Sequence, residues 1–217
     1  MKRNLKPRNR PAHRFRAFSL IEMLMVMAVI GLLTGISMPA ISSLMNARSL
    51  EKAGSDITGL LESARAHALA NNTPVWVGFK DSGQGELLVG VVASRNGEIA
   101  PSQDDLVQIS PTRKFSNIQM KALDASANRP APNAQLASSS AAILPFSVSG
   151  VQAVNFDKQV VQFGSRGEMR IAANQLSKVV EIGLVEMVNG QPRNAANYAA
   201  IQMQGLSGAI SLFRPQL

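Results

Sequence analysis

The chain has 217 residues, of which 46% are hydrophobic and 17% charged, so it can bury the core of one domain of ordinary size and is not a disordered chain. It has no cysteine, which excludes disulfides, thiol catalysis and cysteine-ligated zinc. The net charge of +8 comes from the N-terminus, because seven of the 22 Lys and Arg lie in the first sixteen positions without an acid. The remaining 15 basic residues face 14 acids, so we do not expect the nearly neutral body to bind phosphate groups broadly.

An apolar segment follows these basic residues. Residues 18–38 (FSLIEMLMVMAVIGLLTGISM) contain a single charge, Glu22. As a helix that rises about 1.5 Å per residue, the segment would be about 30 Å long, the thickness of the hydrocarbon core of a bilayer. The basic flank precedes it, so the positive-inside rule predicts that residues 1–17 stay in the cytoplasm and that the C-terminal body lies across the membrane.

Three interpretations of this start are open. The first is a secretory signal peptide cut near Ala40, for which the apolar segment is long and the residues before Ala40 form a poor cleavage site. The second is a simple signal anchor on an unrelated enzyme. The third gives Glu22 a function, because an acid about one turn into a membrane helix is costly and marks a functional site by default.

The residues around Glu22 resemble the prepilin peptidase site of type IV pilins and pseudopilins. Residues 17–22 (AFSLIE) match its order of a small residue, Phe, a hydroxyl residue, Leu, Ile or Val, and Glu, with Ala17 where Gly is usual. Gly31 and Pro39 lie thirteen and twenty-one residues after Phe18, where family members commonly have Gly and Pro.

This resemblance implies a processing pathway and a role for the acid. A prepilin peptidase would cut between Ala17 and Phe18 on the cytoplasmic side, and Phe18 would then be N-methylated. Glu22 would neutralise the free amino group of Phe18 in its own or a neighbouring subunit. Either charge alone would be costly in a low-dielectric layer, so the pairing favours assembly in one register.

The same helix is predicted to continue over residues 39–72 as an amphipathic segment, after a bend at Pro39. The run Asn71–Pro74 ends it, because a residue before proline disfavours the helical conformation. Its apolar residues recur at gaps of mostly three and four, the spacing of one helical face. They are Ile41, Leu44, Met45, Leu50, Ala53, Ile57, Leu60, Leu61, Ala64, Ala68 and Leu69.

From residue 73 the period changes to that of strands separated by Gly-rich corners. We expect strands at residues 75–79, 86–94, 115–123, 159–163, 178–187, 198–203 and 209–213. The predicted fold is α+β: a long N-terminal helix, half in the membrane and half amphipathic, packed on an antiparallel β-sheet domain over 73–217, as in pilins. Residues 124–142 are small, polar and proline-containing, which predicts a mobile surface loop.

Three further stretches resemble a narrower group. Residues 61–75 resemble the end of the long helix in H-type pseudopilins of type II secretion, and residues 161–167 and 201–215 resemble two of their hairpins. Residues 201–215 also resemble a prepilin-like group known from verrucomicrobial genomes as cassette protein D.

No catalytic pattern stands out in the body of the chain. His67 is its one histidine after the leader, and a lone histidine on a face of small residues is usually structural. Asp104-Asp105 is an adjacent pair typical of a solvated turn, and residues 83–85 lack the strand–helix context of a phosphate loop. We therefore expect no enzymatic activity, no cofactor and no metal site.

The function that these features favour is that of a minor pseudopilin, a structural or assembly subunit of a type II secretion-like pseudopilus in the bacterial inner membrane. Its partners would be prepilin peptidase, other pseudopilins, membrane lipid and a secreted substrate. The alternative is a minor pilin of a type IV pilus for DNA uptake or adhesion. Duplex DNA would need a cluster such as Arg166, Arg170, Arg193 and Arg214, and the nearly neutral body makes it the less favoured partner.

Overall fold

A computed structural model describes residues 19–125, 129–148, 153–173, 176–188, 190–193 and 196–215, and of residues 36–48 only the backbone. The chain divides into two compact units, Met1–Leu44 and Met45–Leu217, and each is treated by itself. The expected leader 1–17 and the expected cleavage residues Ala17 and Phe18 lie outside the described residues.

One long helix, α1 (Leu20–Asn71), covers most of both expected helical segments. It ends where the sequence predicts, because Asn72 adopts a left-handed conformation (φ 49°) and the N–H of Thr73 donates to the carbonyl of Ala68 at 3.2 Å. The backbone is helical at Pro39. Its side chain lies outside the described ones, and the bend expected at Pro39 stays a prediction.

Within the unit Met45–Leu217, α1 buries one face. The buried residues are Leu50, Ala53, Ile57, Leu60, Leu61, Ala64 and Ala68, which confirms this part of the predicted stripe. Leu69 is 45% exposed, so its inclusion in the stripe was wrong. It follows Ala68 directly, and adjacent residues point about 100° apart on a helix. Ile41, Leu44 and Met45 lie outside the described side chains.

Two larger sheets and a small one make up the domain. The first has the order β3 (Leu106–Ser116), β2 (Glu86–Ser94), β1 (Val75–Asp81), β8 (Gln159–Phe163) and β9 (Met169–Arg170). The second has the order β11 (Gln191–Pro192), β10 (Val179–Val188), β12 (Tyr198–Gln204) and β13 (Ile210–Phe213), with β4 (Ile118–Met120) and β5 (Ala134–Gln135) also pairing with β10. The third is the hairpin of β6 (Phe146–Val148) and β7 (Val154–Phe156). All pairings are antiparallel except the short contact of β5 with β10, and two 3-10 turns complete the described part, η1 (Gln103–Asp105) and η2 (Leu136–Ser138).

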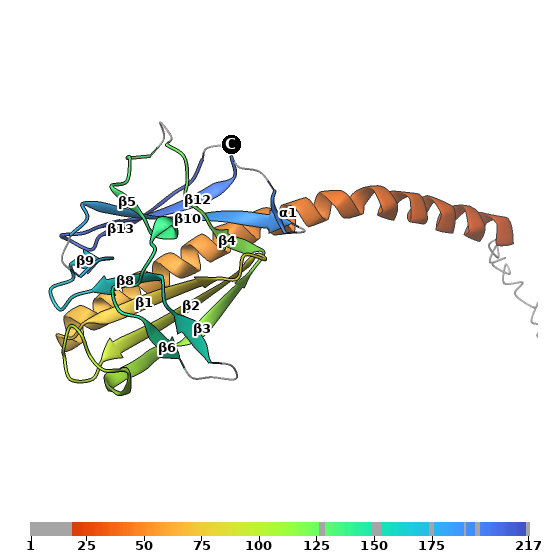
Figure 1. Ribbon diagram of the computed structural model, residues 1–217. Coiled ribbons are helices and arrows are strands. Elements are labelled where there is room, and N and C mark those ends of the chain that lie inside the picture. Colours follow the sequence, from red (N-terminus) through yellow and green to blue (C-terminus); the bar gives the residue numbers. More distant parts are fainter. Residues whose placement is uncertain are drawn as a thin grey trace, which may run out of the picture. The chain divides into compact units, whose positions relative to one another are not determined.

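The core lies where α1 meets both larger sheets. Figure 1 shows the C-terminal half of α1 running between the sheet that contains β1 and β2 and the sheet that contains β10 and β12. The main cluster of buried residues joins the stripe of α1 to Val77 of β1, Val89 of β2, Ile182 of β10 and Ile201 of β12. The expected fold, a long N-terminal helix packed on a C-terminal antiparallel sheet domain, is confirmed.

The strand predicted at 115–123 was wrong. The chain instead leaves β3 after Ser116, turns at Asn117 in a left-handed conformation (φ 61°), and enters β4 in the other sheet. The turn is held because the N–H of Ile118 donates to the carbonyl of Gly85 at 3.1 Å and the N–H of Met120 donates to Oδ2 of Asp81 at 2.9 Å. The predictions for 86–94 and 159–163 match β2 and β8.

The segment 124–142 differs from the mobile surface loop expected there. Its described residues include β5 and η2, and they place Leu136 (0% exposed) in the main core. Arg129 in the same segment is only 6% exposed. Because the segment consists mostly of small and polar residues, its composition did not predict these two buried side chains.

The outer face of the first sheet carries a second cluster built around two aromatic rings. Phe146 and Phe156 of the β6–β7 hairpin have ring centroids 4.9 Å apart. They lie over Gly78 and Gly90, which are direct partners across β1 and β2. A Cβ on Gly78 would lie 2.6 Å from Cγ of Phe156, and one on Gly90 would lie 2.6 Å from its Cε2. The two glycines therefore make the flat floor on which the hairpin packs.

We expect Gly90→Ala to destabilise the domain by about 1–3 kcal/mol, because the added methyl group forces the ring of Phe156 to move. Gly59→Ala is the control, since Gly59 lies in α1 with nothing within 4 Å of an added Cβ. The control should leave the free energy of unfolding unchanged or raise it by up to about 1 kcal/mol. Chemical unfolding of the full chain in detergent measures both, and a Gly90→Ala variant as stable as the parent contradicts the packing described.

Candidate functional site

The first part of α1, in the unit Met1–Leu44, exposes apolar side chains on every face. All described side chains of residues 19–35 are exposed, Leu20 at 82% and Ile21 at 70%. Thr34 satisfies its hydroxyl inside the helix by donating to the carbonyl of Ile30. The described residues contain no helix with the length and hydropathy of a membrane span.

Glu22 is the one charged residue within 19–35 and lies in the first turn of α1. Its backbone N–H donates to the carbonyl of Ser19 at 3.0 Å, which fixes it in the helix start. A carboxylate is favoured there, because the unpaired N–H groups of the first turn carry partial positive charge. Glu22 forms no ion pair with any residue that the structure describes.

A buried ion pair joins Arg129 and Glu181, which sequence reasoning missed. Nε of Arg129 donates to Oε2 of Glu181 at 2.8 Å, and the two side chains are 2% and 0% exposed. Nε2 of Gln202 donates to the same oxygen at 2.8 Å, and Arg129 also donates to the hydroxyl of Tyr198 at 3.2 Å. Every group of this cluster has a partner, so it fixes the segment around Arg129 against β10 and β12 instead of offering a binding site.

The pKa of Arg129 reflects this environment. Burial alone would lower the pKa of the guanidinium, but the hydrogen bond and negative charge of Glu181, with the smaller contribution of Tyr198, raise this pKa above its ordinary value. A raised pKa contributes stability that is fully present below the ordinary value and is lost only as the pH rises through the raised one. This contribution is therefore constant over the physiological range.

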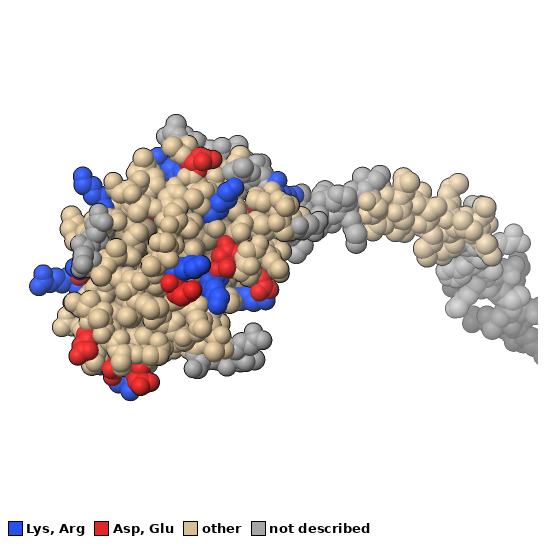
Figure 2. All heavy atoms as spheres, viewed as in Figure 1, with Lys and Arg blue, Asp and Glu red and all other residues tan. Residues whose placement is uncertain are grey.

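The four arginines considered for DNA binding do not form one patch. Arg166 and Arg170 flank Met169, whose N–H donates to the carbonyl of Gly205 beyond the end of β12. Arg193 and Arg214 lie near the start of that seven-residue strand, roughly 20 Å away. Three of the four have a carboxylate nearby: Arg170 to Glu168 at 3.6 Å, Arg193 to Glu186 at 3.4 Å and Arg214 to Glu51 at 3.9 Å. Figure 2 shows basic and acidic residues interspersed over the visible face of the domain.

The weaker candidates for chemistry stay apart from one another. His67 is half-buried on α1, Asp104 and Asp105 lie in η1, and residues 83–85 form the turn between β1 and β2. Asp105 accepts a hydrogen bond from the hydroxyl of Ser102 at 2.7 Å, as in a solvated turn. Over the described part of the chain, no group of three or more His, Cys, Asp or Glu could hold a metal ion.

Comparison with known proteins identifies the N-terminal segment. Residues 12–38 match the prokaryotic N-terminal methylation motif. No match was found among curated proteins. The crystal structure of the type IV minor pilin FimU of Pseudomonas aeruginosa (strain PAO1) is similar over 78% of this chain and 94% of that one, with 15% identity and a TM-score of 0.38.

The matched motif contains the predicted cleavage site, Glu22 and the residues up to Met38. It is of the prepilin type, so the chain is type IV pilin-like at its N-terminus. The motif implies a prepilin peptidase and other pilins as partners. Proteins that carry it are structural subunits and not enzymes.

We expect Arg129→Met to lower the free energy of unfolding by about 3–5 kcal/mol, because Glu181 is then left as a buried, unpaired charge. Chemical unfolding of the full chain measures the change. The control is Arg129→Met combined with Glu181→Met, which removes both charges and should recover most of the lost stability. If the single variant is as stable as the parent, or the double variant is less stable than the single one, the pair does not hold the segment as described.

Proposed function

We propose that the chain is a minor pseudopilin, a structural and assembly subunit of a type II secretion-like pseudopilus. A prepilin peptidase would remove residues 1–17 by cutting between Ala17 and Phe18, and Phe18 would be N-methylated. The observation that carries this proposal is the methylation motif over residues 12–38, within which a lone carboxylate, Glu22, lies in the first turn of an apolar helix.

The proposed anchor is the segment 18–38 in the inner membrane. A helix that is apolar on all faces is stable only when lipid or other helices surround it, and residues 19–35 expose such a surface. Lys and Arg at seven of the first sixteen positions favour a cytoplasmic N-terminus. The domain over 73–217 would then lie in the periplasm, where it could contact other pseudopilins and a secreted substrate.

Glu22 would act as the assembly residue. Cleavage after Ala17 creates an ammonium group on Phe18, four positions before Glu22, at the end of an apolar helix. Transferring a paired carboxylate and ammonium into such an environment costs less free energy than transferring either charge alone. A subunit placed in the wrong register would leave both charges unpaired, so the pair would select one register.

The role of the outer domain would be contact with proteins. The four arginines considered for DNA binding are divided between two ends of the domain, and three of them lie near an acid, which supports a protein partner over DNA. Its buried ion pair is fully hydrogen-bonded and leaves no group free for catalysis.

We expect Glu22→Ala to leave membrane insertion and cleavage intact and to lower incorporation into the filament at least about tenfold, since an uncompensated charge in a low-dielectric layer costs several kcal/mol. Immunoblots of membrane and sheared-filament fractions measure both quantities.

Glu62→Ala is the matched control, because Glu62 is an exposed carboxylate on the same helix but within the folded domain. It should assemble as the parent does. Normal incorporation of Glu22→Ala would contradict the assembly role. Loss of DNA uptake with normal protein export in a strain that lacks the chain would assign it to a type IV pilus instead of a pseudopilus.

A further inference from the structure

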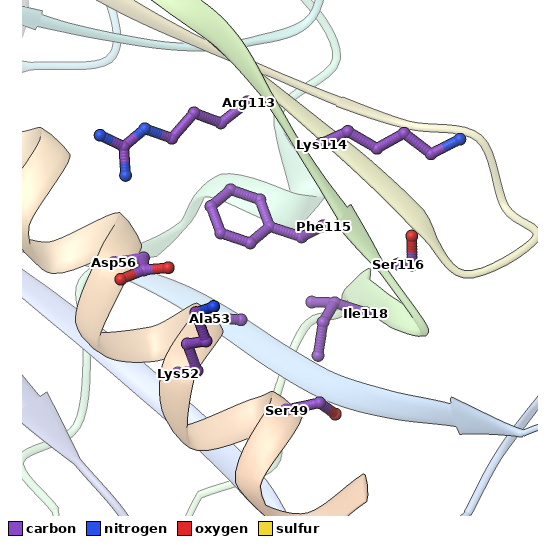
Figure 3. A pocket seen from close by; sticks show the side chains of 9 residues that line it. All are labelled: Ser49, Lys52, Ala53, Asp56, Arg113, Lys114, Phe115, Ser116 and Ile118. Atoms are coloured by element: carbon purple, nitrogen blue, oxygen red, sulfur yellow. The ribbon is translucent and has the colours of Figure 1, made fainter. Parts of the chain in front are cut away.

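An open groove of about 340 Å³ lies between α1 and the end of β3 in the unit Met45–Leu217. Its floor is apolar and consists of Ala53, Phe115 and Ile118. Figure 3 shows the ring of Phe115 pointing from β3 toward α1, with Ala53 on the helix and Ile118 beside it. Phe115 is half-buried, so one side of the ring packs on the core and the other stays accessible to a partner.

The rim of the groove carries an excess of positive charge. Its charged residues are Lys52, Asp56, Arg113 and Lys114. Lys114 is paired with Glu86, whereas Lys52 and Arg113 are exposed and form no ion pair with any described residue. An apolar floor beside two unpaired cations fits an acidic side chain that is next to an apolar one.

The chain presents such a pair of side chains itself. In the connection between β2 and β3, Glu98 is exposed and the neighbouring Ile99 is 68% exposed. The turn is held in place by Asn96, whose Oδ1 accepts from the hydroxyl of Ser94 at 2.7 Å and from the N–H of Glu98 at 3.0 Å. Gly97 supplies the left-handed conformation (φ +77°) that this turn needs.

The turn and the groove lie at opposite ends of the domain. The register of β2 with β3 pairs Glu86 with Ser116 at the groove, and Ser94 with Leu106 at the turn. The nine steps from Leu106 to Phe115 correspond to roughly 30 Å of strand. The turn of one domain therefore cannot reach its own groove but can reach the groove of a copy displaced along the strands.

We propose that the Glu98–Ile99 turn of one copy docks into the groove of a second copy, head to tail. Ile99 would pack on Phe115 and Ile118, and Glu98 would face Lys52 and Arg113. Because the two contacting surfaces differ, each copy keeps a free turn and a free groove, and the contact repeats along a row of subunits.

This contact buries little surface, so its strength depends on two copies held in one membrane, and in that respect it rests on the proposed anchoring. The test uses the full chain, which has no cysteine of its own. Ala100→Cys beside the turn and Ser116→Cys at the groove are combined in one chain, and mild oxidation is applied to membranes. We expect a disulfide-linked ladder of dimers, trimers and higher species on non-reducing gels.

The matched control combines Ala100→Cys with Ser207→Cys, an exposed residue in the turn between β12 and β13. This turn lies at the end of the domain where α1 ends, because Gly208 beside it contacts Arg65. It should give no ladder. Adding Glu98→Lys to the Ala100→Cys/Ser116→Cys chain should reduce the ladder about tenfold, and further adding Lys52→Glu with Arg113→Glu should restore it.

Three outcomes overturn the docking: no ladder forms, Glu98→Lys leaves the ladder unchanged, or the chain is crosslinked only to a protein of another mass. Fractionation of the same samples separates this outcome from failure of the proposed function. A chain that is found in the membrane without a ladder contradicts the docking alone, and a chain outside the membrane contradicts the anchoring as well.

Discussion

The apolar stripe of α1 between the two larger sheets is the contact on which the rest of the domain depends. Both sheets bury their inner faces on it, and neither has another layer to cover that face within the described residues. The stripe combines the small residues Ala53, Ala64 and Ala68 with larger Leu and Ile side chains. Along a single helix, residues 19–35 thus expose apolar side chains on all faces, whereas the residues from Leu50 to Ala68 bury one face against two sheets.

The charged residues also differ between the folded domain and the first part of α1. Inside the domain Arg129 and Glu181 compensate one another with a full set of hydrogen bonds, and at the surface Arg170, Arg193 and Arg214 each lie near an acid. The exposed charges without a described ion-pair partner include Glu22, in the apolar part of α1, and the set at the groove and the turn. These are the charges that a second molecule could neutralise, which is why both proposed contacts between subunits use them.

The periodicity of apolar residues predicted the helix and strands that bury one continuous face. It failed where contacts between distant residues determine the path of the chain. The stripe of α1 and the bounds of β2 and β8 could be derived from spacing and Gly-rich corners. The exchange of sheets at Asn117 could not, because hydrogen bonds from distant residues hold it. Arg129 pairs with a residue 52 positions away, and no local pattern marks such a partner. The prepilin motif was visible because its chemistry is confined to neighbouring residues.

The mature N-terminus of the protein, isolated from its native membrane, tests the central claim most directly. Its sequence and mass should begin at N-methylated Phe18, without residues 1–17. A start near Ile41 would make the chain an exported soluble domain, and an intact Met1 would make it a simple signal anchor. Either result would contradict prepilin processing and the assembly role of Glu22.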